Sequence, residues 1–124
     1  AASTGYRGVV NFESPIAKRY LSFNSDGTGA SLDLDYTFFY ITTGNNAAGD
    51  TWTLPDPNIV DASTYGMDIT ICVIVHSGDD LVVTPTSFVG FSTMTFNAAG
   101  DCASLSFSES GWVAYNDRSV AFAQ

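Results

Sequence analysis

The only histidine of the chain, His76, ends an apolar run that also contains Cys72, and Asp79 and Asp80 follow it. A cysteine activated by histidine requires the two side chains to lie within about 2.6–3.2 Å of each other. Residues i and i+4 of one strand lie about 13 Å apart, at ~3.3 Å per residue. Cys72 and His76 are therefore too distant for this chemistry, and we expect His76 to be a structural residue at a strand end.

The residue types give little support to a metal site. Two cysteines and one histidine would leave a zinc ion without a fourth ligand. Oxygen ligands suited to calcium occur in loops, but none follows the twelve-residue pattern that ends in glutamate. These loop oxygens belong to Asn24, Asp26, Asp79 and Asp80, and we interpret them as turn-forming residues.

Other catalytic patterns are also absent from the sequence. Neither the Gly-x-Ser-x-Gly motif nor a phosphate-binding loop occurs. Glu13 and Glu109 could form the carboxylate pair of a glycosidase, but nothing in the sequence brings them together. The sequence therefore predicts a protein that is not an enzyme and that needs neither a metal nor a cofactor.

Aromatic side chains are the remaining candidates for function, because exposed rings can stack on sugars. Most aromatic residues of a small β-domain are expected in the core or in a subunit contact. Tyr65, which lies in a long polar connection, is the one that we most expect at the surface. The candidates are Tyr6, Tyr36, Tyr40, Trp52, Tyr65, Trp112 and Tyr115.

The composition fits one folded domain over residues 1–124. Apolar residues make up 45% of the chain, and charged residues make up only 14%, below the ~25% of an average soluble domain. The net charge of −9, with only four basic residues, argues against direct nucleic-acid binding and against attraction to anionic membranes. No apolar run approaches the ~18 residues of a membrane span, and no signal peptide is visible.

The two cysteines, Cys72 and Cys102, both lie in strand-like segments. A bridge between them would close a loop of ~30 residues and could add ~3 kcal/mol of stability. Buried free cysteines are common, however, and the sequence does not reveal whether the two residues meet. We expect two free buried thiols, which leaves the redox compartment open.

Alternation of apolar and polar residues with period two predicts an all-β fold. The β-branched segment 68–75 suits a central strand, and short turns at 77–80 and 97–101 suggest hairpins. The pentapeptide of residues 46–50 recurs at 97–101, and the glycine at its fourth place suits a positive φ. Strands are expected at 8–12, 31–36, 38–41, 51–54, 68–75, 81–84, 93–96, 103–107, 112–115 and 120–122. Many short strands separated by turns predict an antiparallel β-sandwich or jelly roll.

The order of segments between Trp52 and Asn116 resembles that of small β-domains in the virions of tailed bacteriophages. The pattern includes Leu54-Pro55-Asp56, the strand 69–75, Ala99-Gly100-Asp101 and Gly111-Trp112-Val113. Such domains occur in capsid decoration proteins and in tail-fibre or spike heads. The resemblance implies a jelly roll or related sandwich, with a likeness to tumour-necrosis-factor-type trimers, and it carries over no catalytic residue.

From this resemblance we expect a capsid decoration (cement) protein that forms a homotrimer and binds the major capsid protein on the outer surface of the phage head. Residues 1–8 would form an extended arm. The basic residues Arg7, Lys18 and Arg19 would meet an acidic shell. The alternative is a receptor- or glycan-binding head of a tail fibre or spike, in which Tyr65 and the loops would contact a glycan.

Overall fold

The computed structural model describes residues 19–25, 27–45, 49–58 and 65–124. These residues form ten β-strands and no helix, which confirms the predicted all-β class. The strands are β1 Tyr20–Asn24, β2 Thr28–Ser31, β3 Phe38–Thr42, β4 Asp50–Leu54, β5 Asp68–Val75, β6 Leu81–Pro85, β7 Thr93–Phe96, β8 Cys102–Ser108, β9 Gly111–Arg118 and β10 Ala121–Ala123.

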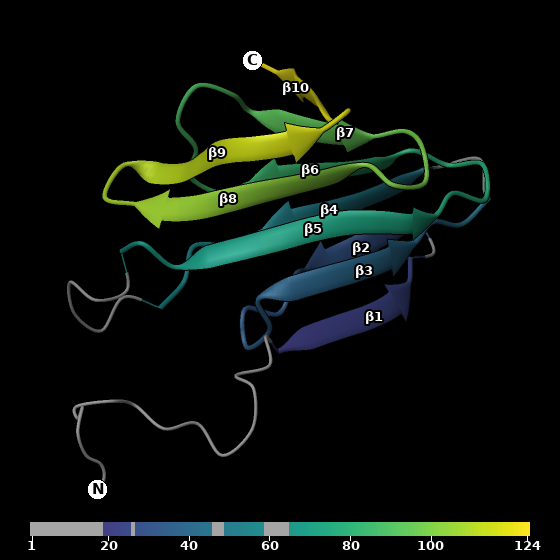
Figure 1. The fold of residues 1–124 in the computed structure, drawn as a ribbon, viewed down its shortest axis with the longest axis horizontal. Helices are drawn as coiled ribbons and strands as arrows, with labels where there is room; N and C mark the ends of the chain where they lie inside the picture. Colours follow the sequence, from purple (N-terminus) through teal and green to yellow (C-terminus); the bar gives the residue numbers. More distant parts are fainter. Residues whose placement is uncertain (1–18, 26, 46–48, 59–64) are drawn as a thin grey trace, which may run out of the picture.

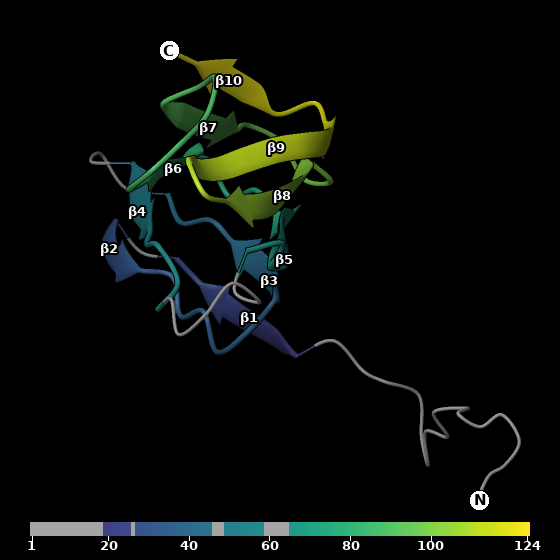
Figure 2. The same cartoon turned by 90° about the vertical axis from the view of Figure 1, so that its left-hand side faces the viewer.

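Two five-stranded sheets face each other as a sandwich (Figures 1 and 2). The first sheet has the order β1-β3-β5-β8-β9, and the second has the order β10-β7-β6-β4-β2. Figure 1 looks onto the first sheet, with the second sheet behind it. Strand β5 lies at the centre of the first sheet, as its β-branched sequence predicted.

The first six strands alternate between the two sheets along the chain. Strands β1, β3 and β5 are parallel neighbours in the first sheet, and β2, β4 and β6 are parallel neighbours in the second. Parallel strands need a long connection, and here each connection contains a strand of the opposite sheet. This part of the chain therefore winds around the core, one strand in each sheet per turn.

The last four strands close the sandwich with antiparallel pairs. Strand β8 pairs with β5 and β9, and β7 pairs with β6 and β10. The sheets are therefore mixed, and the prediction of purely antiparallel sheets was wrong for β1 to β6. The β-sandwich is confirmed, whereas the finer prediction of a jelly roll is not confirmed by this strand order.

The core lies between the sheets and is formed by the inward-pointing residues of both. Trp112 is fully buried there, and its indole N–H donates to the carbonyl of Pro55 at 3.1 Å. The inward residues of β3 and β5 are also fully buried. The largest buried side chains are Trp112, Phe39, Phe96, Ile41, Leu54, Ile69, Ile71, Leu81, Met94 and Leu105.

The turns at 77–80 and 97–101 do not form the predicted hairpins. The first joins β5 of the first sheet to β6 of the second, and the other joins β7 of the second sheet to β8 of the first. Glycine and aspartate satisfy the backbone in either kind of turn. The local sequence therefore predicts the turn but not the sheet in which the next strand lies.

Residues 32–36 form a turn rather than the predicted strand. The Asp33 carboxylate accepts the N–H of Asp35 at 2.9 Å, and the Asp33 carbonyl accepts the N–H of Tyr36 at 3.1 Å. Aspartate is depleted in strands because its side chain competes for the backbone in this way. Leu32 is nevertheless buried, and Leu34 and Tyr36 pack against the core, so the apolar pattern does mark residues that pack inward.

Each copy of the repeated pentapeptide ends in a Gly-Asp pair at the start of a strand, β4 or β8, that follows a crossing between the sheets. Gly49 and Gly100 have φ of 74° and 94°, as the sequence predicted. Asp50 and Asp101, which follow them, are buried. The Asp101 carboxylate accepts the N–H groups of Asn97 and Ala98, so it holds its own turn together. The predicted arm 1–8 and the predicted strand 8–12 lie outside the described residues.

Candidate functional site

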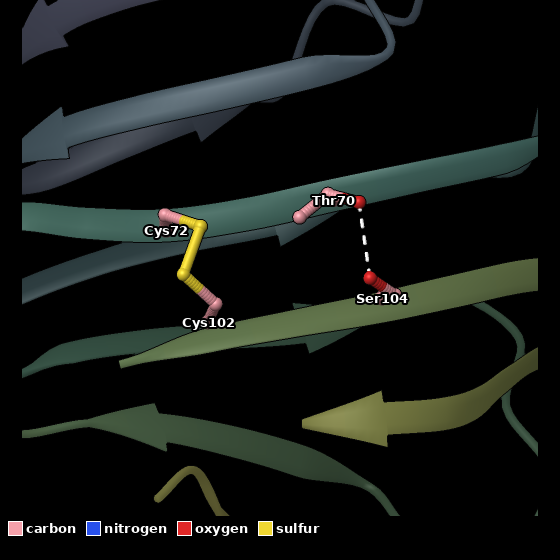
Figure 3. Close-up of a disulfide and its surroundings, with 4 residues drawn as sticks. All are labelled: Thr70, Cys72, Cys102 and Ser104. Carbon is pink, nitrogen blue, oxygen red and sulfur yellow. Dashed lines mark hydrogen bonds between the residues drawn. A yellow bond between two sulfur atoms is a disulfide. The ribbon is translucent and has the colours of Figure 1, made fainter. Parts of the chain in front are cut away.

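Cys72 and Cys102 form a disulfide (Figure 3), so the prediction of two free thiols was wrong. The two residues are directly opposite each other on the antiparallel strands β5 and β8, with their Cα atoms 4.1 Å apart. The pairing depends on the register of strands that are distant in sequence. Disulfides persist in oxidising surroundings and are rare in the cytosol.

His76 lies just beyond the end of β5, where a structural residue was expected. Its Nε2 lies 3.1 Å from Oδ1 of Asp80, and both side chains are partly exposed. The sulfur of Cys72 is held in the disulfide. Within the described ranges, no three His, Cys, Asp or Glu side chains are grouped so that they could hold a metal ion.

The four predicted binding residues do not form a common site in the described part of the chain. Arg19 precedes β1, is exposed, and places its guanidinium 5.6 Å from the centre of the Tyr36 ring. Tyr65 is half-buried, packs against the core and stacks on Phe107 with a centroid distance of 6.0 Å. Its ring is thus partly used in packing. Arg7 and Lys18 lie outside the described residues.

Two exposed regions carry the largest apolar side chains. The first, which we call the apolar edge, consists of Phe88, Val89 and Phe122, exposed by 45%, 41% and 36%. Phe88 and Val89 belong to the connection between β6 and β7, which is bonded to Trp112 on β9, the edge strand of the first sheet. Phe122 belongs to β10, the edge strand of the second sheet. The buried Phe91 ring lies beneath it, 6.4 Å from Phe88 and 5.2 Å from Phe122.

The second region is the outward surface of the first sheet, which we call the outer face. Alternation places Tyr20, Ser22 and Asn24 of β1 and Phe38, Tyr40 and Thr42 of β3 on it. Tyr20 is 62% exposed. Its ring meets the Tyr40 ring edge to face at 5.9 Å, and Phe38 lies 5.0 Å from Tyr40.

The middle of the outer face carries smaller side chains from β5 and β8 (Figure 3). Thr70 and Ser104 share a hydrogen bond of 3.0 Å between their hydroxyl groups, and the disulfide lies one pair further along the two strands. Tyr40 is the register partner of Cys72 on the neighbouring strand. The disulfide therefore lies between the aromatic residues of β3 and the strand β9.

The sequence does not reveal the outer face, although Tyr40 is among the aromatic candidates. Residues 38–41 read Phe-Phe-Tyr-Ile, so apolar residues occupy both sides of the strand and hide its outward side. Residues 20–24 read Tyr-Leu-Ser-Phe-Asn, so an aromatic residue also occupies the exposed side of β1. Only the register of β1 on β3 brings Tyr20, Phe38 and Tyr40 together.

The fold and these surfaces define an all-β sandwich that presents two distinct contact regions. In comparisons with known protein families and with curated proteins, the chain matches none. Among the described residues, no helix has the length and apolar character needed to cross a membrane. The function must therefore be argued from the surfaces themselves.

Proposed function

We propose that the protein is a virion structural protein, a capsid decoration protein that forms a trimer on the outer surface of a phage head. The proposal starts from the resemblance of residues 52–116 to small virion domains. The disulfide supports it, because bridged cysteines are typical of proteins that work outside the reducing cytosol, virion surfaces included.

The observation that carries the proposal is the apolar edge. Phe88 and Phe122 are exposed, their rings both lie near the buried Phe91 ring, and the exposed Val89 follows Phe88 in the sequence. Aromatic residues are enriched at the centres of protein interfaces, and exposed apolar patches mark contact sites. In a closed ring of three copies, each apolar edge would be covered by a neighbouring subunit.

Attachment to the shell is assigned to the N-terminal side of the domain. Arg19 is exposed at the start of β1, and Arg7 and Lys18 precede it in the sequence. Three of the four basic residues of an otherwise acidic chain thus lie within residues 7–19. They suit an acidic surface of the major capsid protein, because complementary charge speeds association and fixes orientation.

Fractionation of the source particle tests this function. Heads and tails would be separated on a density gradient, and the protein would be quantified in each fraction by mass spectrometry. We expect it in the head fraction in a fixed ratio to the major capsid protein. A protein found only with tails, or with neither fraction, would contradict the proposal.

A truncated chain tests the mode of attachment. Added back to heads stripped of the protein, a chain without residues 1–8 should restore lower occupancy than the full chain. Arg118→Ala is the matched control, since Arg118 is exposed on β9 and is distant in sequence from the basic N-terminal group. Equal occupancy for the truncated and full chains would exclude the arm as the clamp.

A receptor- or glycan-binding head of a tail fibre or spike is the second candidate function. The outer face favours it, because Tyr20, Phe38 and Tyr40 gather there on a rigid sheet. The same fractionation separates the two candidates, since a fibre or spike head would be found with the tails.

A further inference from the structure

The outer face differs from the rest of the molecule in its charge. Its outward-pointing strand residues include one carboxylate, that of Asp68, and one guanidinium, that of Arg118. These residues lie near opposite ends of the face, beside Ser106 and Cys102 respectively. Counted over these described strand residues, the charges of the face cancel, whereas the full sequence has a net charge of −9. Such a surface is complementary to an uncharged ligand.

The aromatic residues of the outer face form a corner rather than a flat platform. The Tyr20 and Tyr40 rings are inclined by 61° with their centroids 5.9 Å apart, and the Phe38 and Tyr40 rings are inclined by 40°. The C–H side of a sugar ring packs on the negative face of an aromatic ring. A sugar ring stacked on one of these aromatic rings would contact the next aromatic ring with its edge. The corner therefore suits one sugar unit of a soluble oligosaccharide better than the flat surface of a crystalline polysaccharide.

Hydroxyl and amide groups extend across the same face from this corner, because Thr70, Ser104 and Asn116 follow Phe38 as register partners on successive strands. Thr70 and Ser104 are half-buried and bonded to each other, and each hydroxyl keeps further hydrogen-bonding capacity. Ser22, Ser106 and Asn116 point outward from neighbouring strands. Serine is depleted from the centres of protein interfaces. The mixture of rings and small hydroxyl groups therefore fits a saccharide better than a second copy of the chain.

The outer face is also rigid. The disulfide joins β5 to β8 directly beside Tyr40, and the inward residues of both strands are buried in the core. Sites on rigid elements lose less conformational entropy when a ligand binds. The rings and hydroxyl groups are thus held in place before any ligand arrives.

We propose that the outer face is a binding site for a neutral oligosaccharide, which stacks on Tyr20 and Tyr40 and is hydrogen-bonded by Thr70, Ser104 and Asn116. The site goes beyond the proposed role as a decoration protein and does not depend on it. A head protein or a tail protein could equally present this face.

Titration with cellohexaose, maltohexaose and chitohexaose, followed by the amide shifts of the labelled protein, tests the site. Each sugar would be raised to about 10 mM, which detects millimolar dissociation constants. At least one sugar should shift amides of β1, β3, β5 and β8. Hexagalacturonic acid, which is anionic, and microcrystalline cellulose should bind at least tenfold more weakly than the best soluble neutral sugar.

Variants locate the contact. Tyr20→Ala and Tyr40→Ala should each weaken binding about tenfold, since each removes a stacking ring, while Tyr20→Phe keeps the ring and the affinity. Thr84→Ala is the control, an exposed residue on β6 of the other sheet, and should bind like the wild type. The amide spectrum of each variant shows that it is folded.

Several results would overturn the proposal. These are no shifts with any of the three sugars, shifts confined to the apolar edge, equal or tighter binding of the acidic hexamer, or unchanged affinity of Tyr20→Ala and Tyr40→Ala. If the shifts of outer-face amides depended on protein concentration in the absence of sugar, the face would be a contact between copies. None of these results bears on whether the protein is found with heads, so the two proposals fail separately.

Discussion

At the scale of single residues, Asp50 links two of the connections that lead the chain from the first sheet to the second. Its carboxylate accepts the N–H of Gly27 at 2.8 Å through one oxygen and the N–H of Gly44 at 2.7 Å through the other. Gly27 follows β1 and Gly44 follows β3, so one fully buried side chain joins two connections between the sheets. Hydrogen bonds to a buried charged group are stronger than neutral ones.

We predict that Asp50→Asn lowers the free energy of unfolding by about 1–3 kcal/mol. The asparagine side chain keeps only one acceptor oxygen and places its N–H₂ group against the backbone N–H of either Gly27 or Gly44. That N–H group then loses its acceptor. Urea denaturation measures the change. Asp35→Asn, an exposed carboxylate in the turn after β2, should change stability by less than ~0.5 kcal/mol. Equal stability of the two variants would show that Asp50 has no such role.

The disulfide leads to a second prediction at this scale. It spans 30 residues of sequence, and opening it restores chain entropy to the unfolded state. Reduction, or the double variant Cys72→Ala with Cys102→Ala, should lower the free energy of unfolding by about 3 kcal/mol. The measurement is denaturation with and without reductant.

The double variant is also its own control, because reductant should leave its unfolding curve unchanged. Alkylation and mass measurement of the wild type, produced under oxidising conditions, should find no free thiol. Two free thiols in that sample, or identical curves with and without reductant, would contradict the prediction.

At the scale of elements, the sequence predicted most strands but not how they are connected. Segment 68–75 was predicted with its observed bounds because β-branched residues fill it. Connectivity was not predictable, because glycine and aspartate suit both a hairpin and an arch. Whether β6 pairs with β5 or with β4 depends on contacts between distant segments, and the disulfide was missed for the same reason.

Strand β2 packs closely against Trp52 of the neighbouring strand β4. A Cβ atom added at Gly29 would overlap the Trp52 ring at Cε2. The Trp52 ring is itself fixed, because its N–H donates to Ser25 Oγ at 2.8 Å and its centroid lies 4.9 Å from that of Phe23. The ring therefore cannot move aside without breaking these contacts.

We predict that Gly29→Ala lowers the free energy of unfolding by about 1–3 kcal/mol, as expected for overpacking. Ser31 lies on the same strand and is exposed, so Ser31→Ala should change the free energy of unfolding little. Adding Trp52→Phe to Gly29→Ala should recover part of the loss, because the smaller ring leaves space for the methyl group. The midpoints of thermal unfolding test all three, and a Gly29→Ala variant as stable as Ser31→Ala would exclude the close contact.

At the scale of the whole molecule, the two exposed regions have different chemistry. The outer face belongs to the first sheet, whereas the apolar edge combines β10 of the second sheet with a segment that is bonded to β9 of the first. The apolar edge combines Phe88, Val89 and Phe122, whereas the outer face mixes aromatic rings and the exposed Ile74 with hydroxyl groups. The low fraction of charged residues and the many aromatic residues predicted that apolar side chains are exposed on the surface. The sequence did not locate them, because the apolar edge forms only where the connection before β7 meets β10.

We predict that the apolar edge, and not the outer face, holds the copies of the chain together. Phe122→Asp and Val89→Asp would each place a charge in the contact, and burying an unpaired charge strongly disfavours association. Each should raise the concentration at which the trimer dissociates more than tenfold, which corresponds to about 1.4 kcal/mol or more. Light scattering over a dilution series measures this change.

Ile74→Asp provides the matched control for the oligomer. Ile74 is 46% exposed, similar to Phe88 and Val89, but it points outward from β5 on the outer face. The variant should therefore associate like the wild type. If Ile74→Asp dissociated the oligomer while Phe122→Asp and Val89→Asp did not, the contact would lie on the outer face, and both the trimer arrangement and the saccharide site proposed for that face would have to be abandoned.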